Sequence, residues 1–134
     1  MTYIKLNKEY KDEVVYETML KMGFLHYFDT NYYYNNKGIQ FKNDTEYTFI
    51  GLFLSFDNNI LTINHNHSFL YLSEFLTKHN ITKLSNTDPS SLIDTKYEGK
   101  DPYYCFAKLN NITQKVIITF ISEFDRLYSE IANA

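Results

Sequence analysis

Apolar residues near the C-terminus recur every three or four positions, which is the spacing of an amphipathic helix. The periodic positions are Val116, Ile117, Phe120, Ile121, Phe124, Leu127, Tyr128 and Ile131. The opposite side of the same stretch carries Ser122, Glu123, Asp125, Arg126, Ser129 and Glu130. We therefore predict a helix that begins at Asn111 or Thr113 and buries one face.

The N-terminal region predicts a short strand followed by a helix. The strand covers TYIKL (residues 2–6), and the helix extends to Met22 with Asn7 as its N-cap. The apolar side of this helix consists of Val14, Val15, Met19 and Met22. Gly23 follows at the position where helices commonly end with a left-handed residue.

The middle of the chain is rich in aromatic and β-branched residues, which favours strands separated by turns. The strand candidates are residues 24–28, 31–34, 38–42, 46–56 and 60–66. A turn at NNKG, with Gly38 at positive φ, would join the second candidate to the third. A two-residue loop of Asn58 and Asn59 would place Leu54 opposite Ile63 in the last hairpin.

Helical spacing returns over residues 67–80, with Phe69, Leu72, Phe75 and Leu76 as the apolar stripe. A polar segment over residues 85–102 and a strand over residues 103–109 complete the predicted order. Short links between strands imply an antiparallel β-meander sheet packed by about three helices, which is an α+β fold. A chain of 134 residues fits a single domain over residues 1–134.

The composition agrees with a folded chain and argues against nucleic acid as the partner. Hydrophobic residues make up 44% of the chain, which is too apolar for a disordered protein. Acidic residues outnumber basic ones by 16 to 13, and Arg126 is the only arginine. A phosphate-binding face normally shows the opposite balance, with clustered Lys and Arg.

Cysteine content and N-terminal charge indicate a cytoplasmic protein. Cys105, the only cysteine, excludes an internal disulfide and fits a reducing compartment. Residues 1–15 carry charges where a signal peptide needs an apolar core, and no apolar run approaches the ~18 residues of a membrane helix. On a strand over residues 103–109, Cys105 is expected to be buried and inert.

The stretch INHNHSF holds the main candidates for metal chemistry. His65 and His67 would point to the same side of a strand and could share a metal ion. His26, His79 and Glu74 are conceivable further ligands. The pair resembles the H-x-H motif of cupins, but the flanking glycines of that motif are absent here. In the alternative interpretation, both imidazoles continue the strand towards the sheet edge and meet water.

The tyrosine run at residues 32–34 is a candidate contact surface. Alternation along a strand sends Tyr33 to one face and its two neighbours to the other, so at least one face meets the core. Tyrosine on the remaining face suits a protein interface because it buries a large area with few rotatable bonds. Stacking on bases would need a basic groove, and only Lys37 and Lys42 lie nearby in the sequence.

Segment 85–102 is long for a loop of a compact domain, and such loops are commonly functional. Its candidate partner-binding residues are Asp88, Asp94, Tyr97, Glu98 and Asp101. Carboxylates beside a tyrosine suit a basic partner, because opposite charge steers the encounter. The alternative is a solvated connection without a role.

The sequence contains no Gly-rich phosphate loop, nucleophile elbow or dinucleotide fingerprint, so we expect no cofactor and no enzymatic turnover. We predict a binding protein that inhibits another protein. The target would be a basic toxin, as for an immunity protein, or a bacterial defence enzyme blocked by a phage protein. Two alternatives are a metal-dependent hydrolase or small-ligand binder at His65 and His67, and a self-associating structural subunit that uses Tyr33 and the mixed face of the strand over residues 46–56.

Overall fold

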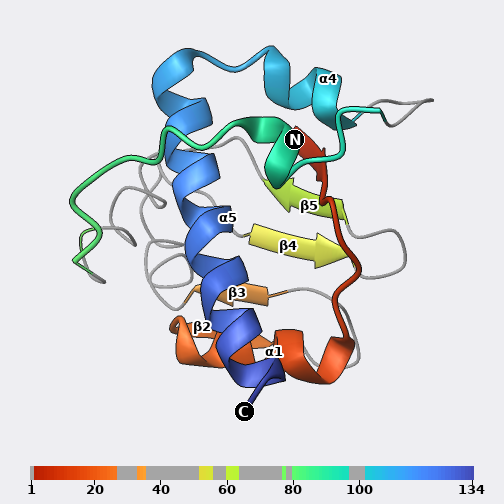
Figure 1. Cartoon of the computed structure of the whole chain (residues 1–134), viewed down its shortest axis with the longest axis vertical. Helices are drawn as coiled ribbons and strands as arrows, with labels where there is room; N and C mark the ends of the chain where they lie inside the picture. Colours follow the sequence, from red (N-terminus) through yellow and green to blue (C-terminus); the bar gives the residue numbers. More distant parts are fainter. Residues whose placement is uncertain are drawn as a thin grey trace, which may run out of the picture.

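The computed structural model describes residues 2–26, 33–35, 52–55, 60–63, 77, 80–96 and 102–134. Helices and antiparallel strands pack together in these residues, which confirms an α+β fold (Figure 1). The strands are β1 (Thr2–Lys5), β2 (Phe24–His26), β3 (Tyr33–Asn35), β4 (Leu52–Ser55) and β5 (Ile60–Ile63). The helices are α1 (Asp12–Lys21), α4 (Pro102–Ala107) and α5 (Asn111–Ala132), together with the short 3-10 helix η2 (Pro89–Ser91).

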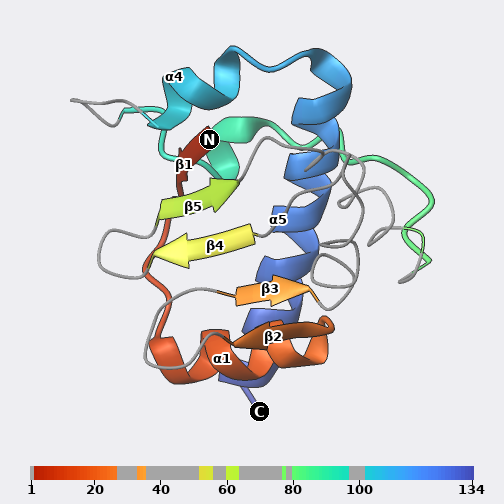
Figure 2. The same ribbon diagram turned by 180° about the vertical axis from the view of Figure 1, so that it is seen from behind.

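Every described strand pair is antiparallel. β1, β5 and β4 form a sheet in that order, and β2 pairs with β3. β3 also lies beside β4, so β2 to β5 follow one another in space in their chain order (Figure 2). β1 lies outside β5, at the other end of this row from β2.

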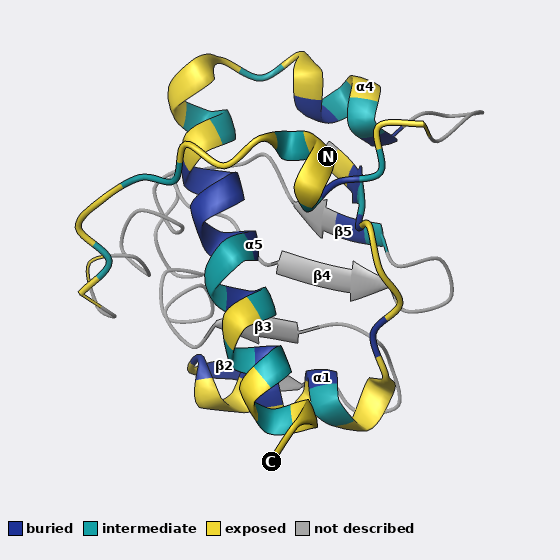
Figure 3. Cartoon of the chain, in the orientation of Figure 1, coloured by how far each residue is buried: buried dark blue, intermediate teal, exposed yellow. Residues whose placement is uncertain are grey.

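The long helix α5 crosses the row of strands and supplies much of the core (Figure 1). Its buried positions are Val116, Ile117, Ile118, Thr119, Phe120, Ile121, Phe124 and Tyr128. Figure 3 shows these positions concentrated in the middle of the helix, with exposed residues towards its ends. The predicted apolar face is therefore confirmed, although Leu127 and Ile131 are only half-buried.

Asn110 is the N-cap of α5, one residue before the predicted start. Its side-chain oxygen accepts a hydrogen bond of 2.8 Å from the backbone N–H of Thr113. This bond satisfies one of the N–H groups that the first turn of a helix leaves without an intrahelical partner.

The buried side chains form one cluster that joins strands, helices and a residue of segment 85–96. Ile4 of β1, Leu61 of β5 and Phe106 of α4 are each at most 1% exposed. The rings of Phe24 and Phe120 meet edge to face, with centroids 5.9 Å apart. Aromatic contacts of this geometry stabilise a core beyond the area they bury.

Helix α1 begins later than the sequence pattern predicts. Lys11 occupies the N-cap position and makes no side-chain capping hydrogen bond. Asn7 does not cap the helix, because its amide donates instead to the carbonyl oxygens of Ser90 and Ser91, at 3.3 and 3.4 Å. Gly23 follows the helix at φ 90°, the left-handed conformation expected there.

The predicted strand over residues 103–109 is wrong, since this stretch contains α4. Tyr103, Phe106 and Leu109 face inward at helical spacing, whereas Tyr104 is 57% exposed. Pro102 precedes them at the first helical position, where its missing N–H costs nothing. Over so short a stretch, the helical and strand periods select overlapping sets of apolar residues.

The β4–β5 hairpin forms with a register different from the predicted one. Leu54 pairs with Leu61, not with Ile63, and Ser55 pairs with Ile60. This register is not the one that a two-residue loop of Asn58 and Asn59 would give. A shift of two residues keeps the same side chains on each face, so the predicted apolar alternation is compatible with both registers.

Three further predictions concern residues that the structure does not describe, in whole or in part. The turn at residues 35–38 and the strand at 38–42 lie outside the described residues, apart from Asn35 at the end of β3. Of the predicted helix 67–80, Thr77 is described as helical and Asn80 follows at φ 57°. Within the described residues, every helix is too short or too polar to cross a bilayer.

Candidate functional site

Two of the predicted partner-binding residues, Asp88 and Asp94, lie in the described part of the chain with their side chains. Tyr33 is described only as the first residue of β3. The remaining predicted contact residues and the histidine pair lie outside the described residues, namely Tyr97, Glu98, Asp101, His65 and His67. Their roles stay predictions.

Residues 88–94 are attached to the core through Ile93, although the other side chains of this stretch are exposed or half-buried. Ile93 is completely buried and forms a β-bridge with Leu6 at the end of β1. The backbone N–H of Asn7 donates to the carbonyl of Leu92 at 3.0 Å, and the N–H of Asp94 donates to the carbonyl of Lys5 at 2.8 Å. Residues 92–94 therefore pair with the end of β1 through backbone hydrogen bonds.

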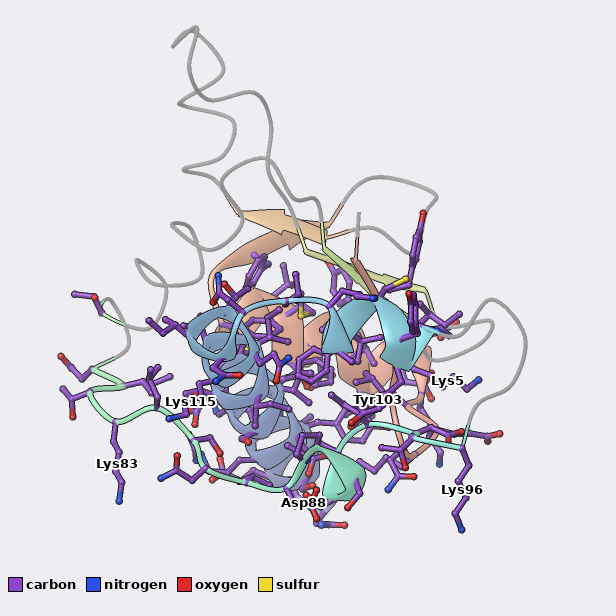
Figure 4. The ribbon with its side chains drawn as sticks, turned by 90° about the horizontal axis from the view of Figure 1, so that it is seen from above. Lys5, Lys83, Asp88, Lys96, Tyr103 and Lys115 are labelled. Carbon is purple, nitrogen blue, oxygen red and sulfur yellow. The ribbon has the colours of Figure 1, made fainter. Side chains whose placement is uncertain are left out.

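Asp88 caps the 3-10 helix at the start of this attached stretch. Its carboxylate accepts a hydrogen bond of 3.0 Å from the backbone N–H of Ser90. This bond lowers the pKa of the Asp88 carboxyl below its ordinary value, because it stabilises the ionised form. Asp88 is exposed, and Figure 4 shows it at the periphery of the molecule. A negative charge therefore faces solvent at a defined position.

Asp94 has a similar local role at the end of the attached stretch. Its carboxylate accepts a hydrogen bond of 2.9 Å from the backbone N–H of Lys96, and its side chain is half-buried. Both acids thus orient their own backbone, as Asp commonly does in turns. These hydrogen bonds also fix the positions of the two carboxylates before any partner binds.

A pocket of about 250 Å³ lies between residues 85–89, α4 and the first turns of α5. Its apolar lining comes from Pro89, Phe106 and Ile118. Its polar lining comes from Ser85, Asn86, Thr87, Asn111, Gln114 and Lys115. Sequence reasoning missed this pocket, because its walls come from three separate segments and none of them carries a recognisable ligand motif.

Hydrogen bonds fix the walls of the pocket. The side chain of Thr119, a buried residue of α5, makes two hydrogen bonds. Its hydroxyl accepts a bond of 2.5 Å from the backbone N–H of Ser85 and donates to the carbonyl of Lys115. On the other side, the amide of Gln114 donates to the carbonyl of Leu109 at 2.9 Å. The walls of the pocket are therefore held in place by hydrogen bonds within the protein, without a ligand.

A second polar cluster joins the β1–α1 connection to α5. The ammonium of Lys8 lies 2.5 Å from the carboxylate of Asp125, which also accepts a bond of 3.1 Å from the hydroxyl of Tyr10. The hydroxyl of Tyr128 accepts a bond of 2.7 Å from the backbone N–H of Lys11. Burial raises the pKa of the Tyr10 hydroxyl, and the negative charge of Asp125 raises it further.

This cluster is best explained as a structural connection. The rings of Tyr10 and Tyr128 meet edge to face at 4.8 Å, and both residues are 7% exposed. A tyrosine whose pKa is raised stays neutral and donates a hydrogen bond, so it does not act as a base near neutral pH. No sequence signal marked the cluster. Tyr10 fell within the predicted N-terminal helix, and Asp125 fell on the polar side of the predicted C-terminal helix.

Metal and thiol chemistry find no further support in the described part of the chain. No three His, Cys, Asp or Glu side chains converge there as a metal site. Cys105 lies on α4 and is half-buried, which corrects its predicted place on a buried strand. The histidine pair stays a predicted metal site.

Comparison of the chain with protein-family models, with curated proteins and with solved structures finds no match. The geometry and charge of the surfaces described above therefore indicate what the protein is able to bind.

Proposed function

We propose that this protein binds another protein and inhibits it, using the acidic segment, defined here as residues 88–101. The observation that carries the proposal is the anchoring of this segment by Ile93, which is completely buried. Asp88 and Asp94 lie on either side of that anchor and have their own backbone hydrogen bonds. Association costs less when the contact groups are ordered before the partner arrives.

The charge of the segment indicates the chemistry of the partner. Four acids, Asp88, Asp94, Glu98 and Asp101, stand in the sequence with two bases, Lys96 and Lys100, and with Tyr97 as an aromatic anchor. A basic surface would complement them, since opposite potentials accelerate encounter and exclude wrong partners. A toxin or a defence enzyme with a basic nucleic-acid-binding face has this property.

The proposal also includes the cellular compartment and the arrangement of the strands. An inhibitor of this kind would act in the cytoplasm, where a single cysteine stays reduced. We further infer that β2 to β5 form one antiparallel meander. In that arrangement residues 92–94 follow the edge of the sheet at β1, so the acidic segment is displayed from a rigid sheet edge.

The test uses substitutions that remove charge and keep the local hydrogen bonds. Asn replaces Asp at residues 88 and 94, because an Asn side-chain oxygen still accepts the bonds from Ser90 and Lys96. The wild type and the Asp88→Asn/Asp94→Asn variant serve as parallel baits in lysate of the native host, and the captured partner is then purified for binding kinetics. Asp12→Asn, on the first turn of α1, is the matched control.

We expect the double variant to bind about fivefold to tenfold more weakly, mainly through a slower association rate that depends less on salt. The control should bind as the wild type does. Equal binding by the double variant would refute the proposed role of the segment. A wild-type bait that captures nothing beyond what an unrelated acidic protein captures would refute the proposed function.

A further inference from the structure

The pocket beside α5 differs in chemistry from the acidic segment. Of the residues that line it, Lys115 is the one with a charged side chain. Phe106 and Ile118 lie at its base but expose little surface, 1% and 3% of each residue, whereas Pro89 in the same lining is half-buried. A small apolar surface beside a single positive charge is suited to a ligand that has an apolar body and a negative head group.

Three of the polar side chains at the rim, those of Lys115, Asn86 and Asn111, are available to a ligand. Across the described residues, no carboxylate lies within ion-pair distance of the Lys115 ammonium, and the side-chain amides of Asn86 and Asn111 make no hydrogen bond. Gln114 differs, because its amide is already held by the carbonyl groups of Ala107 and Leu109. Figure 4 shows Lys115 on the flank of α5, near the segment that contains Ser85 to Pro89, with Lys83 pointing away into solvent.

We propose that this pocket binds a small organic acid, a monocarboxylate with a compact apolar body. The apolar body would contact Pro89 and the exposed edges of Phe106 and Ile118, and the carboxylate would accept hydrogen bonds from the Lys115 ammonium and the Asn111 amide. Charge-assisted bonds of this type are stronger than neutral ones. The inference is separate from the proposed inhibition, since Pro89 of the acidic segment lines the pocket but none of the segment's carboxylates does.

Size and net charge both restrict the ligand. A volume of about 250 Å³ is below the roughly 300–1,000 Å³ of pockets for drug-sized ligands, so the body is no larger than about one ring. The chain has a net charge of -3, which disfavours non-specific attraction of anions. Binding of an anion would therefore report a local site.

The test is a titration of the ¹⁵N-labelled full chain with benzoate, followed by NMR chemical shifts. Benzyl alcohol, which has a similar body and no charge, is the comparison ligand. We expect benzoate to shift the amide signals of residues 85–87 and 111–115 with a Kd of about 1 mM, a value typical of so small a ligand. Benzyl alcohol should bind about tenfold more weakly.

Two lysine variants separate the pocket from general charge. Lys115→Met should weaken benzoate binding about tenfold, since methionine keeps the length of the side chain and removes its charge. Lys83→Met, which changes an exposed lysine outside the pocket lining, should leave it unchanged. Benzoate shifts that map elsewhere, or an unchanged Kd in Lys115→Met, would overturn the inference whether or not a protein partner is found.

Discussion

Replacing Ile93 with alanine asks whether the acidic segment belongs to the folded core. The side chain is completely buried, and the residues on either side of it make backbone hydrogen bonds to Lys5 and Asn7. Alanine keeps the backbone and removes only the part of the side chain that contacts the core. The substitution therefore isolates the contribution of the anchor.

The expected loss can be worked out from the burial of Ile93. Alanine removes about three methyl or methylene groups, each of which contributes about 0.8 kcal/mol when buried. The transfer contribution is therefore about 2.5 kcal/mol, and the cavity that remains raises the loss in unfolding free energy to about 3–4 kcal/mol. This is a large part of the roughly 5–15 kcal/mol by which domains are usually stable.

Urea unfolding followed by circular dichroism measures this loss. The Ile93→Ala variant should unfold at a lower urea midpoint with an unchanged slope, which is the signature of altered stability without altered compactness. Ile112→Ala is the matched control, because Ile112 is 60% exposed and its truncation should cost no more than about 0.5 kcal/mol.

Amide hydrogen exchange gives a second, local readout. The N–H groups of Asn7 and Asp94 should exchange faster in Ile93→Ala, because both donate across the contact that Ile93 anchors. If Ile93→Ala costs less than about 1 kcal/mol and matches Ile112→Ala, the segment does not depend on this anchor and the argument for a pre-ordered binding surface fails.

Two further predictions concern the hydroxyl and amide groups that hold α5. Tyr10→Phe should lower stability at neutral pH by about 1 kcal/mol, because the bond to Asp125 is lost. The pKa of Tyr10 is raised in the folded state, so its contribution is present below the ordinary value of 10.0 and is lost as pH rises above it. The stability difference between wild type and Tyr10→Phe should therefore shrink in urea unfolding above about pH 10, and a constant difference would contradict the assignment. Asn110→Ala should cost about 1 kcal/mol by thermal unfolding because the N-cap bond to Thr113 is removed, whereas Asn110→Asp should retain most of it; equal losses in the two variants would exclude a capping role.

The local roles of the two acids affect how the binding surface has to be tested. Alanine at Asp88 or Asp94 would remove a charge and also a hydrogen bond to the backbone of Ser90 or Lys96. A weaker complex would then have two explanations. Asparagine at the same positions removes only the charge, so a weaker complex would then have a single explanation.

Elements with a long or strongly alternating pattern were predictable from the sequence alone. Helix α5 spans 22 residues, so its apolar period is repeated often enough to exclude a strand. β1 and the left-handed Gly23 were also predicted, because each depends on the conformational preferences of a few adjacent residues. These features need little information from the rest of the chain.

Tertiary contacts decided the features for which local patterns were ambiguous. In α4, Phe106 is buried under either period, and packing against β1 selects the helix. In the β4–β5 hairpin, registers that differ by two residues expose the same faces, so the apolar pattern does not choose between them and the pairing within the folded sheet does.

The candidate sites depend most on tertiary structure. Ile93 is one of two adjacent aliphatic residues, Leu92 and Ile93, in a polar segment, and its burial depends on the contact with the end of β1. Thr119 is polar yet buried, because residues near Ser85 cover that side of α5. The sequence determined which residues are able to be buried and which carry charge. The fold determined which of them meet, because contacts between distant segments depend on the packing of the whole core.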